Sequence, residues 1–442
     1  MPERRVVITG IGPITAFGVG IDPLWEGLCA GHTAITRSDR FVPPFLSPFV
    51  AELPAETFRV RDVVPKSYRK NTKVMCRDVE LAVGAAAAAI ADAGLVTKGI
   101  DASVEPTIAP DRFGCHIGAG LISADVDELT AALVTSRNGS GTFDLAHWGQ
   151  QGMQNLTPLW LLKYLPNMLA CHVTIVHDCQ GPSNTITCCE ASSALSLGES
   201  VRVIDRGAAD ACLTGGAECK LNAMAYMRQQ LAGRIAPAHD DDDPAAVARP
   251  FDVSAAGTVL GEGGGILVLE ALDTATARDA TPYAEVTGFA TTQSFCPDTV
   301  GLAIDPDDES LGDALSLAIE QAGLTPDAID AVVPFGSGIP GVDRAEAVAL
   351  GRVFGERTAA IPIVTTVPNV GNCGAGNGAV GLSVAARCVR DQTLPARLAS
   401  GDAGTLDAGT AETRPASLAH VLVMTNSQGG QNAAVVLSRL DA

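Results

Sequence analysis

Apolar runs of strand length alternate with helix-like stretches along this chain. Residues 6–12 read VVITGIG, an apolar run that ends at a glycine, and this pattern predicts a buried strand followed by a turn. Residues 112–118, 211–216 and 266–270 have the same character. Residues 78–94 are alanine-rich with apolar positions at helical spacing, and Gly94 stands where such a helix would stop.

The alternation begins again in the last third of the chain. It predicts a strand from about residue 284, a helix over residues 311–323 and a strand over residues 328–335. Strands that alternate with helices in this way predict an α/β protein whose helices cover its sheets. No residue-level repeat relates the earlier and the later cycle.

Composition is that of a large globular protein with an acidic surface. The chain has 442 residues, of which 47% are hydrophobic and 18% charged, enough apolar material for a large core. The formal net charge of −20 argues against nucleic acid as a partner and disfavours an anionic membrane surface. The acidic run at residues 240–243 lacks the spacing of a calcium loop and predicts a solvated loop instead.

Neither an export signal nor a cofactor motif is visible. Residues 1–5 lead directly into the predicted first strand, and no apolar stretch is long enough to span a bilayer, so we expect a cytoplasmic protein. In that compartment the twelve cysteines would be reduced, and no CxxC pair indicates zinc. GxxxxGK[ST] is absent, and we expect no nucleotide and no other cofactor.

Five glycine-rich segments carry a resemblance to a known family. They are residues 6–12 with Gly18 and Trp25, residues 181–183 with Gly198, residues 249–252 with 261–263, residues 336–338 with Pro340, Asp343 and Glu346, and residues 371–378 with 429–432. In order and spacing, from about residue 6 to 437, the chain resembles β-ketoacyl-acyl carrier protein synthases, the ketosynthase branch of the thiolase-like superfamily. The resemblance implies a five-layer αβαβα fold of two similar halves, residues 1–270 and 271–442, with a pocket between them.

The residue expected to be the nucleophile is absent. In such synthases a cysteine stands nine residues after the glycine of the Gly-Pro-Ser segment, and nine residues after Gly181 stands Glu190. Counting back from Gly198, the next family glycine, gives the same position. Cys188 or Cys189 remains an alternative nucleophile, although successive strand side chains point opposite ways, so at most one of them could face the site.

The other condensing residues are replaced as well. The resemblance places the two family histidines at Phe335 and Asn372 and the supporting lysine at Val367. The glycine-rich gate beside the substrate reads Ser427, Gln428, Gly429 and Gly430. Carbon–carbon condensation needs a thiolate to carry the acyl chain and polar donors to stabilise an enolate. The sequence therefore predicts a chain that does not condense acyl groups.

The resemblance implies a role as a companion subunit. A chain-length factor of a type II polyketide synthase lacks the cysteine, forms a heterodimer with a cysteine-bearing ketosynthase, and helps to form the tunnel that receives the growing chain from an acyl carrier protein. The usual residue there is glutamine, so Glu190 is a departure: it is either an anion held by amide groups at a helix N-terminus or a working carboxylate.

Two other functions stay open. One is a stand-alone enzyme that uses Glu190 for decarboxylation or acyl transfer, and the other is an inactive regulator that binds an acyl carrier protein or a lipid. We expect a dimer, a homodimer if no partner is present, in which a strand over residues 184–187 and the preceding residues 166–177 form the interface.

Overall fold

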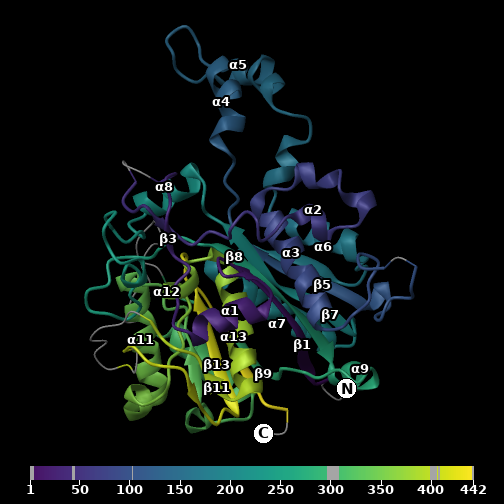
Figure 1. The fold of residues 1–442 in the computed structure, drawn as a ribbon, viewed down its shortest axis with the longest axis vertical. Coiled ribbons are helices and arrows are strands. Elements are labelled where there is room, and N and C mark those ends of the chain that lie inside the picture. Colours follow the sequence, from purple (N-terminus) through teal and green to yellow (C-terminus); the bar gives the residue numbers. More distant parts are fainter. Residues whose placement is uncertain are drawn as a thin grey trace.

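The computed structural model describes residues 4–41, 45–101, 103–295, 308–398, 406 and 409–440 (Figure 1). Its strands are β1 (Val6–Thr15), β2 (Gly18–Val19), β3 (Thr36–Arg37), β4 (Phe49–Val50), β5 (Phe113–Ala119), β6 (Ser183–Ile186), β7 (Ala211–Cys219), β8 (Glu262–Ala271), β9 (Ala284–Gln293), β10 (Ala331–Val333), β11 (Thr393–Leu394), β12 (Arg414–Pro415), β13 (His420–Asn426) and β14 (Gln431–Ser438). Its α-helices are α1 (Ile21–Cys29), α2 (Val60–Val63), α3 (Arg77–Asp92), α4 (Val126–Thr135), α5 (Leu145–Gln150), α6 (Met168–His177), α7 (Ser192–Asp205), α8 (Ala223–Leu231), α9 (Leu272–Ala277), α10 (Ser310–Gln321), α11 (Pro340–Phe354), α12 (Val367–Val370) and α13 (Asn377–Asp391).

Ten of these strands form one mixed sheet whose two parts come from the two parts of the chain, while β3 pairs with β4 and β11 with β12 in separate two-stranded sheets. The order of the mixed sheet is β10-β13-β14-β9-β1-β8-β7-β5-β6, with β2 paired to β1. The two parts meet where β1 pairs with β9 through only two register pairs, Val7 with Glu285 and Ile8 with Ala284. Because so few residues pair here, the two parts of the sheet can twist away from each other, and helices can pack between them.

The helices make three layers around these two parts of the sheet. Helix α3 packs on β1, β7 and β8, with α6 beside it on the same side (Figure 1). Helices α7 and α13 contact each other in the centre, and α13 touches both β8 and β13. Helix α10 covers β9 and β14 and packs on α11. The predicted α/β class and its helix–sheet–helix–sheet–helix layering are confirmed.

The apolar pattern located most of these elements. The predicted strands at residues 6–12, 112–118, 211–216 and 266–270 correspond to β1, β5, β7 and β8, and the predicted helices at 78–94 and 311–323 to α3 and α10. Gly94 has φ +65 just after α3, the conformation that ends a helix and that a side chain would disfavour. The strand predicted over residues 328–335 was too long, because β10 covers only Ala331–Val333.

Strand β8 passes through three consecutive glycines, residues 263–265. Strand β8 begins at Glu262 and runs through the glycines, pairing with β1 on one side and β7 on the other. A Cβ on Gly264 would overlap the carbonyl oxygen of Gly216 on β7, and one on Gly263 would overlap that of Ile14 on β1. Glycine here permits close approach of three backbones and does not mark a chain reversal.

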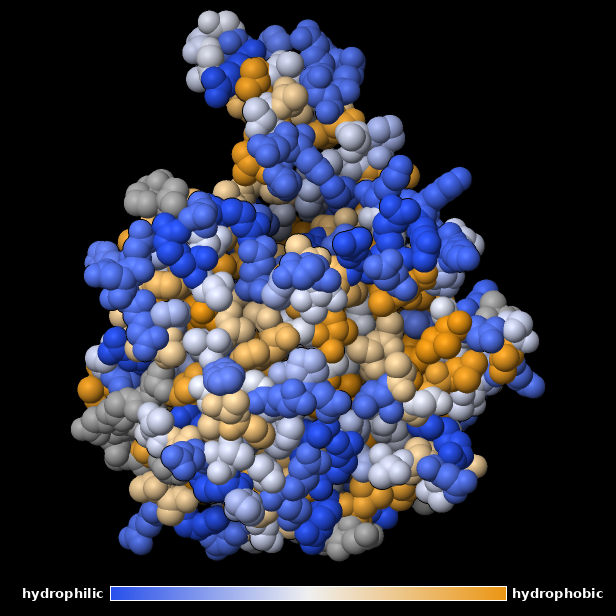
Figure 2. Space-filling model, viewed as in Figure 1, coloured by the Kyte–Doolittle hydropathy of each residue, from blue (hydrophilic) through white to orange (hydrophobic). Residues whose placement is uncertain are grey.

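An arm projects from one end of the body. It comprises residues 121–165, and its helices α4 and α5 stand clear of the sheet, with α4 packed against α5 and the turn Gly152–Asn155 (Figure 1). In Figure 2 apolar residues appear on the arm and at its base, among polar ones. Large apolar side chains exposed on this arm are those of Leu121, Val126, Leu133, Val134, Phe143, Leu145, Met153, Leu159 and Leu161.

Candidate functional site

Glu190 lies on a sharp turn between strand β6 and helix α7. The turn is the 3₁₀ segment Cys189–Ala191, and Cys189 has a left-handed backbone with φ +48. The side chain of Glu190 points inward and only 2% of the residue is exposed. The suggestion that residues 188 and 189 alternate along a strand was wrong, since β6 ends at Ile186.

A cation from a distant segment holds the Glu190 carboxylate. The guanidinium of Arg234, just after α8, forms an ion pair with Oε1 of Glu190, and the side chains of both residues are 3% exposed. The backbone fixes Arg234 from both sides: its N–H donates to the carbonyl of Gln229 over 3.0 Å, and its carbonyl accepts from Thr258 over 2.8 Å. The second oxygen of Glu190 accepts the N–H of Gln428 at 3.3 Å.

This arrangement keeps Glu190 ionised. Burial alone would raise the pKa of the Glu190 carboxyl, but the positive charges of Arg234 and Lys220 outweigh burial, and the pKa lies below its ordinary value. The expectation that helix-end amides compensate the charge therefore needs correction. The backbone groups of Glu190 itself and of Gln428 take part, but the principal counter-charge is the side chain of Arg234.

A second buried pair lies beside the first. Glu218, at the end of β7, forms an ion pair with Lys220 and accepts the N–H of Ala375 at 2.7 Å. Burial alone would lower the pKa of Lys220, but Glu218 and then Glu190 raise it above its ordinary value. Both pairs adjoin a cavity of about 360 Å³. It is lined by Leu121, Ser123, Cys189, Glu190, Glu218, Lys220, Ala225, Arg228, Gln229, Ala232, Gln428 and Gly429.

The two cysteines next to Glu190 are poor nucleophiles. Burial, and then the charge of Glu190, raises the pKa of the Cys189 thiol to about 11. Burial also raises the pKa of Cys188. At neutral pH a thiol with a pKa of about 11 is about 10⁻⁴ ionised, and the thiolate is the reactive species. This geometry supplies no activated thiol at the position where Glu190 stands.

Phe335 and Val367 belong to an apolar core cluster that also contains Phe49 and Val259. Their side chains add no polar group to the cavity at Glu190.

The loop that carries Phe335 is held firmly. Glu346 accepts the backbone N–H groups of Phe335 and Gly336 at 3.0 and 2.9 Å. Asp343 accepts those of Ser337 and Gly338 at 2.9 and 3.0 Å. Burial raises the pKa of Glu346 to about 8 and that of Asp343 to about 6. These hydrogen bonds fix the backbone of the loop, although the side chain at position 335 is apolar.

Asn372 supports the backbone near the site. Its side-chain oxygen accepts the N–H of Gly374 at 2.9 Å and the amide of Asn377 at 2.6 Å, and the residue is 1% exposed. This holds the turn Gly374–Gly376, which packs against the turn of Glu190. Asn372 therefore positions a neighbouring loop, and its oxygen is already occupied.

Residues 427–430 form the hairpin between β13 and β14. Gly429 and Gly430 have φ +105 and +88, and the Ser427 hydroxyl donates to Gln431 at 2.6 Å. The Gln428 side-chain oxygen accepts from Arg234 at 3.3 Å, in addition to the bond from its backbone to Glu190. The hairpin is thus tied to the buried ion pair.

Of the candidate residues, the structure brings Glu190, Gln428 and Gly429 together at one cavity, whereas Phe335, Val367 and Asn372 do not line it. The sequence analysis missed Arg234, Lys220 and Glu218. The one available signal was physical: a carboxylate buried at position 190 needs a counter-charge, but nothing in the sequence says which arginine provides it.

None of the helices in the described part of the chain combines the length and the hydropathy that crossing a membrane requires. Within the same residues, no three His, Cys, Asp or Glu side chains converge as metal ligands would.

Comparison with known proteins matches the chain over nearly all of its length. Residues 3–275 match the model described as "Beta-ketoacyl synthase, N-terminal domain" and residues 283–400 the one described as "Beta-ketoacyl synthase, C-terminal domain". The 3-oxoacyl-[acyl-carrier-protein] synthase 2 of Staphylococcus aureus is 29% identical over 447 residues, covering 100% of this chain and 99% of that protein. The protein of the same name from Coxiella burnetii is 29% identical over 450 residues, covering 100% of both.

Solved structures give the same picture. The ishigamide ketosynthase/chain length factor superimposes with a TM-score of 0.80 at 25% identity, covering 99% of each chain. A beta-ketoacyl synthase from Burkholderia phymatum gives a TM-score of 0.81 at 28% identity, covering 99% of this chain and 100% of that one. At 21% identity and a TM-score of 0.82, a chain from the complex of a type II polyketide synthase acyl-carrier protein with its ketosynthase shares the fold, covering 99% of this chain and 100% of that one.

Proposed function

Because this chain belongs to the β-ketoacyl synthase family, we propose that it is a non-condensing, chain-length-factor-like subunit. In this role it pairs with a cysteine-bearing ketosynthase and helps to shape the tunnel for an acyl or polyketide chain. The observation that carries the proposal is Glu190, which stands on the turn before α7 and is committed to Arg234.

The chemistry of the site supports a non-condensing role. Condensation starts when a thiolate takes the acyl group from a carrier thioester, and this turn presents a carboxylate instead. An acyl group on a carboxylate would be a labile anhydride. The enolate formed by decarboxylation of the extender also needs polar donors, and Phe335 lies in an apolar cluster. Residues of one catalytic unit depend on one another, so the loss of one removes most of the activity of the whole set.

The ion pair also argues against a stand-alone enzyme that uses Glu190 as a base. A carboxylate whose pKa lies below the ordinary value is a weak base. Its two oxygens are engaged by Arg234 and by the N–H of Gln428, so proton abstraction would first have to break a buried pair.

Exposed surfaces favour pairing with another subunit. Strand β6 is the edge of the sheet, and Ser183 and Asn184 on it are exposed. On the adjacent helix α6, Ile175 is 58% exposed. An open edge next to apolar surface favours pairing with another chain, and the exposed apolar arm ends close to α6 in the sequence. A homologous subunit, related by an approximate two-fold axis, would present a matching edge.

One basic surface suits an acyl carrier protein. Segment 59–73 carries six cations in a chain with a net charge of −20, and five of them are exposed. Figure 2 shows strongly hydrophilic residues over this region at α2. A carrier protein is usually acidic, so this patch would steer it toward the site. The patch consists of Arg59, Arg61, Lys66, Arg69, Lys70 and Lys73.

Co-expression tests the proposal. The chain is expressed with a tag beside an intact ketosynthase encoded next to it, purified by the tag, and weighed by native mass spectrometry. We expect a one-to-one heterodimer, and no acyl adduct on this chain after incubation with acyl carrier thioesters. A homodimer that ignores the ketosynthase, or a stable adduct on Cys188 or Cys189, would contradict the companion role.

A further inference from the structure

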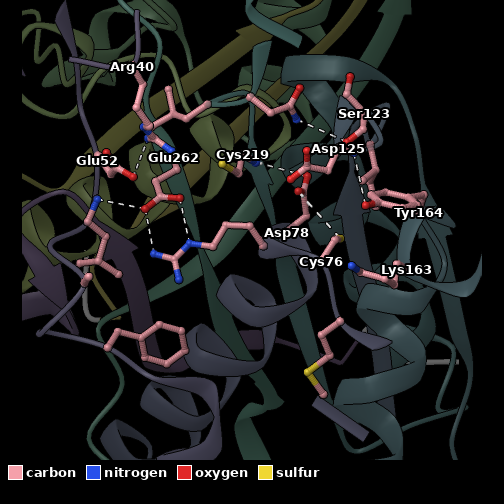
Figure 3. A pocket seen from close by; sticks show the side chains of 18 of the residues that line it. Arg40, Glu52, Cys76, Asp78, Ser123, Asp125, Lys163, Tyr164, Cys219 and Glu262 are labelled. Carbon is pink, nitrogen blue, oxygen red and sulfur yellow. Dashed lines mark hydrogen bonds and ion pairs between the residues drawn. The ribbon is translucent and has the colours of Figure 1, made fainter. Parts of the chain in front are cut away.

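A second and larger cavity, of about 750 Å³, lies at the base of the arm. Its walls come from the segment around residues 52–58, the start of α3, the foot of the arm and the end of β7 (Figure 3). Successive residues at the end of β7 and just beyond it face different cavities: Glu218 and Lys220 line the one at Glu190, whereas Cys219 and Leu221 line this one. The two cavities are therefore neighbours separated by one stretch of chain.

Each cation in the wall of this larger cavity already has a carboxylate partner. Arg40 pairs with Glu52 at 2.6 Å. Lys163 pairs with Glu128. The guanidinium of Arg77 makes two bonds to Glu262, at 2.8 and 2.9 Å. Each of these three ion pairs is neutral, so none of the three cations is left over to pair with another carboxylate in the wall.

Asp78 is a buried carboxylate of the wall that takes part in none of these three pairs. It lies near the centre of the view in Figure 3, between Glu262 on one side and Tyr164 on the other, and it is 4% exposed. One of its oxygens accepts the N–H of Cys219 at 3.2 Å. The other lies 4.0 Å from the thiol of Cys76, a weak donor. Among the residues that the structure describes, no cation lies within ion-pair distance of Asp78.

The surroundings of Asp78 are unfavourable to its charge. Burial, and next the nearby Glu218, raises the pKa of Asp78 to about 7, although Lys220 and the N–H of Cys219 act in the opposite direction. A buried carboxylate without a counter-ion is costly, and a cation brought to it would be stabilised in turn. Asp125, at the mouth, is a second unpaired carboxylate, but its side chain caps α4 by accepting the N–H of Asp127 at 3.0 Å.

We propose that this cavity binds a small molecule through a primary ammonium group, which pairs with the carboxylate of Asp78. The volume is that of a small-molecule site. An ammonium group supplies both the missing positive charge and strong hydrogen-bond donors to Asp78. The carbon skeleton of the ligand would contact the apolar part of the wall, which includes Leu53, Phe58, Met75, Ile122 and Leu221. This proposal does not depend on the companion role, because Asp78, the residue that would hold the ammonium group, has no part in that role.

Two probes of equal length test the charge requirement. The full-length chain is titrated with 6-amino-1-hexanol and with 1,6-hexanediol, and binding is followed by ligand-observed NMR. We expect saturable binding of the amine at least tenfold tighter than that of the diol. Equal binding of the two probes, or no saturable binding of the amine, would overturn the proposal.

Three variants locate the binding. Asp78→Asn should weaken amine binding at least tenfold, whereas Asp125→Asn, which has the same net charge, should change it less than twofold. Ala55→Trp places an indole at an exposed position of the wall, leaves Asp78 unchanged, and should also weaken binding. If Asp78→Asn does not fold, Ala55→Trp alone decides. Equal effects of the two Asn variants, or normal binding by Ala55→Trp, would place the amine on the general acidic surface and refute the site.

Discussion

Substitution of Arg234 by methionine isolates the buried ion pair on which the candidate site is built. Arg234→Met keeps most of the aliphatic length of the side chain and removes the charge that faces Glu190. Both partners are 3% exposed, so water cannot replace the lost guanidinium. Removing one member of such a pair costs about 3–5 kcal/mol, because the other charge is left buried. The substitution should therefore lower the unfolding temperature markedly.

The pKa of Glu190 determines how the loss of stability in Arg234→Met changes with pH. In the wild type the pKa of Glu190 is lowered, so this group adds stability above its unfolded pKa and loses it as the pH falls through the folded value. Without Arg234, burial would dominate and raise the folded pKa of Glu190. A raised carboxyl pKa destabilises the fold most at high pH. The loss of folding stability caused by Arg234→Met should therefore be largest at pH 8 and become smaller as the pH approaches 5.

Thermal unfolding followed by circular dichroism at pH 8 and pH 5.5 measures both effects. Glu190→Gln combined with Arg234→Met should recover most of the loss, since replacing a whole buried pair is often neutral. Arg206→Met removes a surface partner of Glu199, 4.0 Å away, and should cost less than about 1 kcal/mol. A stability of Arg234→Met within about 1 kcal/mol of the wild type at pH 8, or a deficit independent of pH, would refute this account of the site.

Three further predictions follow from the same structure. Glu190→Cys should accept an acyl group at most and yield no condensation product, because Phe335 still offers no donor; product detected by mass spectrometry would show that the site is less altered than we infer. Cys189 should react with iodoacetamide far more slowly at pH 7.5 than at pH 10.5, since the pKa of its thiol is about 11, and labelling at equal rates would contradict that value. Gly198→Ala should cost about 1–3 kcal/mol, because its Cβ would overlap the ring of Phe289, whereas Gly341→Ala, with open space around it, should be neutral or stabilising; equal unfolding temperatures of the two variants would count against the packing.

The sequence by itself determined the class of fold and the place of Glu190 between two glycine-marked segments. Apolar periodicity is local, so it located α3, α10 and four strands to within a few residues. The spacing from Gly181 and Gly198 placed Glu190 at the turn before α7, where the structure has it. The sequence also shows three consecutive glycines at residues 263–265. Only the neighbouring backbones of β1 and β7 show why a strand needs glycine there.

Tertiary structure alone decided what these residues do to one another. Arg234 is 44 residues from Glu190 in the chain, and Asp78 is 141 residues from the Cys219 N–H that it accepts. Pairings over such separations depend on how helices and strands pack, and packing leaves no local period that a sequence could display. Burial also depends on tertiary packing. The carboxylates of Glu190 and Asp78 are both buried, but the pKa of Glu190 is lowered because a cation lies beside it, whereas that of Asp78, which has no such partner among the described residues, is raised.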